Sequence, residues 1–111
     1  DCFVGMFGYH GAVLLETLST VEPPPAALKL VVFDEDERVL QGIENGTIYG
    51  TVVQDPYKYG YEAVRMLTTL HAGRNNELPI ADRGSLFLPC ELVTAENVSE
   101  FRDRLRTRIG P

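Results

Sequence analysis

Short apolar runs alternate with longer amphipathic segments in the first half of the chain. Apolar residues dominate 2–7, 28–33 and 47–54, and short runs of this kind bounded by turn residues are typical of buried strands. Between these runs, residues 11–21 and 34–46 carry apolar side chains at helical spacing, the second segment after an acidic first turn. The pattern predicts two strand–helix units followed by a third strand.

The segment from about residue 57 to residue 71 predicts a helix with one apolar side. In the simplest interpretation, the residues of this side pack inward; they are Tyr61, Val64, Leu67 and His71. A loop follows at 73–79. Residues 83–92 then predict a fourth strand, at an edge or crossover position because Pro89 has no backbone N–H to donate.

A last helix near the C-terminus completes the pattern. Its apolar stripe, which we expect to be buried, consists of Val98, Phe101 and Leu105. The predicted order is therefore β-α-β-α-β-α-β-α. Strands that alternate with helices of this length favour an α/β fold with a parallel, doubly wound sheet covered by helices on both faces.

Polar side chains follow three of the predicted strands. Tyr9 and His10 follow the first strand, Asp34 the second, and Gln54 and Asp55 the third. Right-handed crossovers bring the carboxyl ends of parallel strands to one edge of a sheet, where ligands bind. A helix N-cap would equally explain Asp34, and turn chemistry would equally explain Asp55.

Composition and charge narrow the classes of partner. The 111 residues are 44% hydrophobic and carry a net charge of -6, which suits one modest core and disfavours binding to nucleic acid or an anionic membrane. Four arginines, at every second position from 102 to 108, are expected to form a solvated terminal turn, with a phosphate site as the alternative. Because the chain begins at Asp1 on an apolar run, we expect it to be a piece of a longer protein.

The sequence contains none of the common catalytic motifs. A GxSxG elbow, an HExxH helix, a P-loop and a glycine-rich dinucleotide turn are all missing, and His10 and His71 are isolated. The acidic run at 34–37 is typical of a helix's first turn. Cys2 and Cys90 form no CxxC pair, and we expect both to be buried as small hydrophobes. We predict a protein that is not an enzyme and has neither cofactor nor metal.

Three long segments carry a family resemblance. They read GMFGYHGAVLLETL, then LKLVVFDEDERVLQGIENGTIYGTVVQDPYKYGYEAVRML, then GSLFLPCELVTAENVSEF. Nearly the whole chain resembles the C-terminal part of the type I periplasmic binding proteins, the ribose-type sugar-binding fold shared with the effector domain of the lactose-repressor family. The resemblance implies a two-lobed clamshell that closes on a sugar or a similar small polar molecule.

The resemblance also implies a set of ligand-binding residues. Asp34 stands where the family's aspartate accepts hydrogen bonds from sugar hydroxyls, and Gln54 stands where a glutamine contacts the ligand at the lobe crossover. His10 replaces an asparagine that is usual in the family, so the ligand's identity stays open. Tyr9 and Tyr57 offer apolar surface for the face of a sugar ring, with core packing as the alternative.

The family topology divides the chain into three segments. Residues 1–54 belong to the C-terminal lobe, 55–87 to a crossover segment of the N-terminal lobe, and 88–111 to the returning chain in the C-terminal lobe. Residues 54–56 would then form a hinge. The helix within 55–87 would lack its own sheet, so we expect the isolated fragment to self-associate as a dimer.

These inferences favour a bacterial receptor that works in the periplasm or elsewhere outside the cytoplasm. It would bind a sugar or polyol and deliver it to the permease of an ABC importer. The main alternative is the effector domain of a lactose-repressor-family regulator, and a third is the sensor domain of a membrane receptor. Such regulators usually read L-T-T-V-x-Q-P at the third strand, whereas this chain reads GTVVQDP, which favours the importer class.

Overall fold

The computed structural model describes residues 1–22, 28–80 and 84–109. Two compact units make up the chain. The first combines Asp1–Val53 with Glu91–Pro111, and the second consists of Gln54–Cys90. The first unit contains the sheet, and the second is built on one long helix.

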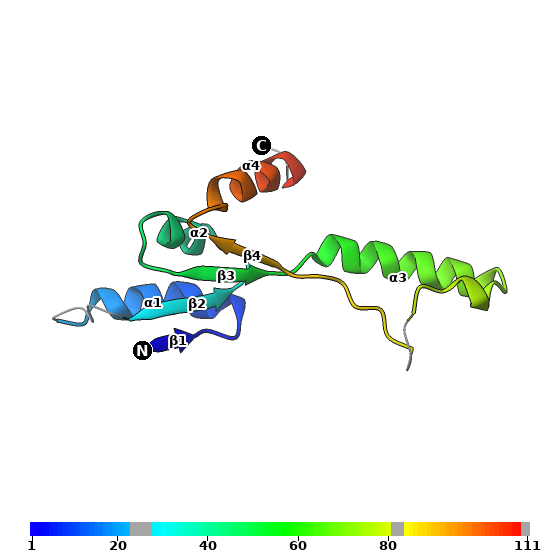
Figure 1. Cartoon of the computed structure of the whole chain (residues 1–111), viewed down its shortest axis with the longest axis horizontal. Coiled ribbons are helices and arrows are strands. Elements are labelled where there is room, and N and C mark those ends of the chain that lie inside the picture. The colour runs from blue at the N-terminus through cyan, green and yellow to red at the C-terminus, as the bar shows by residue number, and fades with distance from the viewer. Residues whose placement is uncertain (23–27, 81–83, 110–111) are drawn as a thin grey trace. The chain divides into compact units, whose positions relative to one another are not determined.

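Four strands lie side by side in chain order in the first unit (Figure 1). They are β1 (Cys2–Val4), β2 (Lys29–Phe33), β3 (Gly50–Val53) and β4 (Glu91–Thr94). The first three are parallel, whereas β4 runs antiparallel to β3. The predicted α/β class is confirmed, with a mixed sheet in place of a wholly parallel one.

The fourth strand differs from the prediction in both position and direction. It covers Glu91–Thr94, not residues 83–92, of which residue 83 lies outside the described part of the chain. Val53, the last residue of β3, is paired with Glu91, the first residue of β4. The chain therefore leaves β3 and enters β4 at the same end of these strands, without crossing a face of the sheet. As a result, β4 runs opposite to β3.

Three helices cover one face of this sheet. Helix α1 (Gly8–Ser19) contacts β2 and α2 (Glu37–Glu44), and α2 in turn contacts α4 (Val98–Ile109). The buried side chains between the helices and the strands include Leu30, Val32, Val39, Leu40, Ile43, Val93, Val98 and Phe101. Leu105 packs against this core, so the stripe predicted for the last helix is confirmed.

No described helix covers the opposite face of the sheet. Side chains that alternate with the core positions are only partly buried or exposed, with Val4 53% and Leu92 57% exposed. The prediction of helices on both faces is therefore wrong for the described chain. Only residues 2–4 of the run at 2–7 form a strand, and this edge strand is exposed, not buried. Cys2 and Cys90 are also exposed, not buried.

Arg102 links α4 to both ends of α2. Its guanidinium lies 2.7 Å from a Glu44 carboxylate oxygen and 3.4 Å from one of Glu37, and its side chain is only 14% exposed. Arg104 pairs with Glu91 on β4. The expectation of a solvated arginine cluster is therefore wrong for Arg102, because it lies one helical turn after the buried Val98 and so faces α2.

The second unit contains α3 (Pro56–His71), a short 3-10 turn η1 (Asn75–Glu77) and the residues up to 90. The less exposed side of α3 within this unit consists of Tyr59, Glu62, Met66 and Thr69. The side predicted to pack inward is exposed instead, with Val64 64% and Leu67 65% exposed. Among the described residues, none of the helices is both long and apolar enough to cross a membrane.

Candidate functional site

Asp34, directly after β2, has an unusual backbone conformation. Its φ is 68°, in the left-handed region that few residues other than glycine adopt, although aspartate tolerates it better than most. Among the described residues it is the one non-glycine residue with a positive φ. Such a conformation costs on the order of 1–3 kcal/mol and persists only where neighbouring structure enforces it.

Strand β3 holds both backbone groups of Asp34. The Asp34 N–H donates to the Val52 carbonyl at 3.0 Å, and the Thr51 hydroxyl donates to the Asp34 carbonyl at 2.8 Å. The Thr51 side chain is fully buried, so its hydroxyl is fixed beneath the turn. These two bonds explain how the strained conformation is maintained.

Helix capping does not account for Asp34. The N-cap of α2 is Asp36, whose side chain accepts a hydrogen bond from the Arg38 N–H at 2.9 Å. The Arg38 side chain also donates to Asp36, which lowers the pKa of that carboxyl below its usual value. The Asp34 side chain is half-buried, and no described residue donates a hydrogen bond to it. The carboxylate is therefore free to accept hydrogen bonds from a ligand.

The first turn of α1 lies against the Asp34 side chain. A Cβ atom placed on Gly8 would come within 2.5 Å of the Asp34 Oδ2 atom. Phe7, the N-cap of α1, makes no side-chain hydrogen bond to the helix. The positive end of the helix dipole thus adjoins a carboxylate, which is a favourable arrangement.

Three aromatic rings gather at the same end of α1. The Phe7 and Tyr9 rings are stacked with centroids 5.9 Å apart, and the His10 ring meets Tyr9 edge-on at 4.6 Å. Phe7 is 59% and Tyr9 67% exposed, whereas His10 is half-buried. The cluster offers apolar ring faces beside the polar edges of Tyr9 and His10, a combination that suits the face of a sugar ring.

Phe7 had no place among the residues predicted for the site, because the apolar run at 2–7 assigns it to a strand. The segment GMFGYHG does contain a signal, since aromatic residues flanked by glycines rarely belong to a strand interior. Thr51 was also missed. The signal for Thr51 in the sequence was a hydroxyl side chain within the otherwise apolar strand GTVV.

Gln54 and Asp55 follow β3 at the start of the second unit. The Asp55 side chain accepts a hydrogen bond from the Lys58 N–H at 3.0 Å and so caps α3, and Pro56 occupies the first helical turn. The cap and turn interpretation of Asp55 is therefore confirmed. Gln54 is exposed, and its role in ligand binding stays a prediction.

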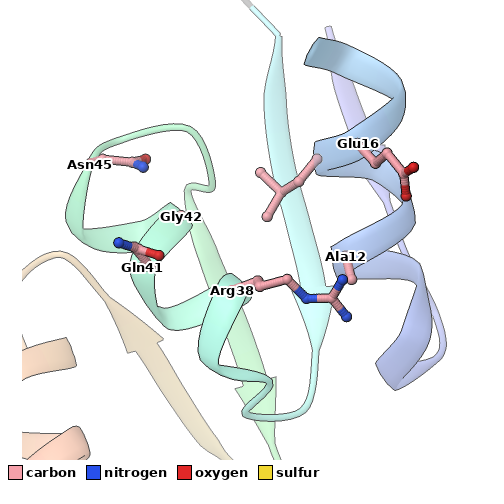
Figure 2. Close-up of a pocket in the computed structure, with 7 residues that line it drawn as sticks. Ala12, Glu16, Arg38, Gln41, Gly42 and Asn45 are labelled. Carbon is pink, nitrogen blue, oxygen red and sulfur yellow. The ribbon is translucent and has the colours of Figure 1, made fainter. Parts of the chain in front are cut away.

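A pocket of about 380 Å³ lies elsewhere, between α1 and α2 (Figure 2). Seven residues line it: Ala12, Leu15, Glu16, Arg38, Gln41, Gly42 and Asn45. In Figure 2 the Arg38 side chain extends from α2 toward α1 across an open space. None of the residues predicted to bind a ligand lines this pocket.

Among the described residues, no group of three or more His, Cys, Asp or Glu side chains could hold a metal ion.

No protein-family model and no curated protein sequence matches the chain. The similar solved structures include AraP and a chain of the XylFII-LytSN complex. AraP, an arabinose binding protein from Geobacillus stearothermophilus, has a TM-score of 0.64 and 22% identity, with 91% of this chain and 35% of AraP covered. A chain in the XylFII-LytSN complex has a TM-score of 0.66 and 17% identity, with 86% of this chain and 31% of that chain covered.

These likenesses confirm the predicted fold class. The chain has an α/β fold similar to that of part of each matched structure, and it spans about a third of each matched chain.

Proposed function

We propose that this chain is part of a solute-binding protein that works outside the cytoplasm and binds a sugar or a related polyol between two lobes. The observation that carries the proposal is the Asp34 carboxylate. The Asp34 backbone is held in a strained conformation, and its carboxylate receives no hydrogen bond from the described residues. Backbone strain of this kind is concentrated at functional sites.

Each residue of the proposed site has a chemical role. The Asp34 carboxylate accepts hydrogen bonds from two neighbouring hydroxyls, which a sugar or polyol provides. The Gln54 amide and a neutral His10 imidazole each offer one donor and one acceptor, which suits hydroxyls because they do the same. Tyr9 supplies a ring for the apolar face of the sugar, and the exposed Phe7 ring extends that surface.

The proposed lobes follow the division of the chain. Residues 1–54 and 88–111 belong to one lobe, 55–87 belong to the other, and residues 54–56 act as the hinge. The separation of Gln54–Cys90 into a compact unit of its own supports this division.

Delivery to the permease of an ABC importer is the activity we propose for the intact protein. Support comes from the likeness to AraP, whose name records arabinose binding. An open pair of lobes that closes on its solute gives the permease a shape by which to distinguish loaded from empty receptor.

A panel of sugars tests the ligand class. We expect the melting temperature of the intact protein to rise with one or a few pentoses, hexoses, disaccharides or polyols, since a ligand at a hundredfold excess over Kd stabilises by about 2.7 kcal/mol. The D and L forms of each sugar provide the matched control, because nonspecific stabilisation is the same for both. Equal effects of both forms across the panel would contradict the proposal.

A further inference from the structure

We propose that Gly8 is a positioning residue for the Asp34 carboxylate. Without a side chain at this position, the first turn of α1 closes onto Asp34 and fixes where its Oδ2 atom lies. This inference rests on the proposed function only in assigning Asp34 to ligand binding. The contact between Gly8 and Asp34 itself is a property of the free protein.

The contact concerns the Asp34 side chain specifically. A Cβ atom on Gly8 would lie 2.5 Å from Oδ2 and 3.4 Å from both Cβ and Cγ of Asp34. Something must move to relieve a contact below 3.0 Å. The Asp34 backbone is tied to β3 through Val52 and Thr51, so the carboxylate is the group that would be displaced.

Backbone conformation gives no other reason for glycine at this position. Gly46, Gly73 and Gly84 have positive φ values, whereas Gly8 does not. Gly8 is the first residue of α1, and glycine inside a helix is about 1 kcal/mol less favourable than alanine. The close approach to Asp34 is what the absence of a side chain permits.

Gly11, one turn further along α1, provides a matched control. A Cβ atom there would lie 2.4 Å from the Val39 Cγ2 atom, in the core between α1 and α2. The two glycine-to-alanine substitutions therefore both create contacts below 3.0 Å on one helix. An alanine side chain at position 8 would contact the carboxylate, whereas one at position 11 would contact the core.

Calorimetry on the intact protein tests the inference with arabinose, or with the panel sugar that gives the largest melting shift if the wild type does not bind arabinose. We expect Gly8→Ala to raise Kd by about tenfold or more, the effect of losing one well-placed hydrogen bond to a charged group. Gly11→Ala should lower the melting temperature and leave Kd within about twofold. In an Asp34→Ala background, Gly8→Ala should have no further effect on Kd.

A readout without ligand keeps the inference separate from the proposed function. Asp34→Gly removes the group that an alanine at position 8 would contact, so Gly8→Ala should lower the melting temperature less in an Asp34→Gly background than in wild type, whereas Gly11→Ala should lower it equally in both. Absence of this difference would overturn the inference, as would an unchanged Kd in Gly8→Ala. A wild type that binds no sugar overturns the proposed function, while the melting comparison still decides the role of Gly8.

Discussion

At residue 34, an aspartate occupies a conformation that glycine would adopt at lower cost. The buried Thr51 hydroxyl and the Val52 carbonyl hold it there. Its position after a strand was predictable from the alternation of apolar and polar residues. The strain was not, because φ depends on hydrogen bonds from β3 that no local pattern encodes.

The choice between cap and ligand residue could not be made from the sequence either. Asp34 and Asp36 both lie in a run of four acidic residues at 34–37, and either aspartate is an acceptable N-cap by residue type alone. Only the Arg38 N–H, which donates to Asp36, identifies the cap.

Thr51 is the residue through which the conformation of Asp34 can be tested most simply. Thr51→Val keeps the shape of the buried side chain but removes the donor to the Asp34 carbonyl. We expect the free energy of unfolding to fall by about 1 kcal/mol or more, the cost of leaving one acceptor unpaired. Urea denaturation measures it. Thr51→Ser keeps the hydroxyl and should lose less, and equal stability of Thr51→Val and wild type would contradict the assigned bond.

At the scale of elements, the presence of the helices was easier to predict than the faces they present. The range of α3 was predicted within one residue, yet its exposed side carries Val64 and Leu67. Apolar spacing identifies a stripe but does not reveal which partner covers it. The exposure of Arg102 was predicted wrongly for the same reason, since a basic side chain can face either solvent or the glutamates of α2.

The N-cap of α2 has a pH-dependent contribution to stability. The pKa of Asp36 is lowered by its hydrogen bonds with Arg38, so this contribution is present above the ordinary pKa of about 4 and is lost as pH falls through the lowered folded value. Because the Asp36 side chain is 37% exposed, screening keeps the ionic part small and the cap dominates.

Asp36→Ala tests that contribution. At neutral pH we expect a loss of about 1 kcal/mol in the free energy of unfolding, the usual cost of removing an N-cap. The difference from wild type should shrink as pH is lowered below about 4. Asp36→Asn retains a cap without a titrating group and should stay near wild type at neutral pH. Denaturant titrations across this range measure the effect, and a deficit that stays constant down to low pH would contradict it.

At the scale of the whole molecule, the fold class was predictable and the covering of the sheet was not. The strands at 2–7 and 28–33 have similar apolar patterns, but the side chains of β1 are exposed while those of β2 contribute Leu30 and Val32 to the core. Which strand lies at an edge depends on pairings between distant segments.

Two apolar surfaces of the chain are exposed. One is the open face of the sheet, with Val4 and Leu92, and the other is the exposed side of α3, with Tyr61, Val64 and Leu67. Contiguous apolar surfaces of this kind are normally covered by another chain or segment. Since the chain spans about a third of AraP, we propose that the remainder of the intact protein covers them.

The isolated 111-residue chain should therefore self-associate. We expect light scattering to report a dimer or a larger species, because burial of these surfaces between copies removes apolar area from water. Replacing Val64 and Leu67 together by aspartate should shift the equilibrium toward monomer if α3 mediates the contact. The same replacement of the exposed Val13 on α1 is the control. A well-folded monomer of the unmodified chain would contradict this expectation.

We propose that ligand binding by its carboxylate is the reason why Asp34 keeps a strained conformation. One thermal denaturation experiment on the intact protein, with and without the sugar identified by the panel, tests it in the Asp34→Gly variant. We predict a free protein at least as stable as wild type, since glycine relieves the positive φ, and a ligand-induced rise in melting temperature that is lost. A variant that keeps the full ligand-induced rise would contradict the account.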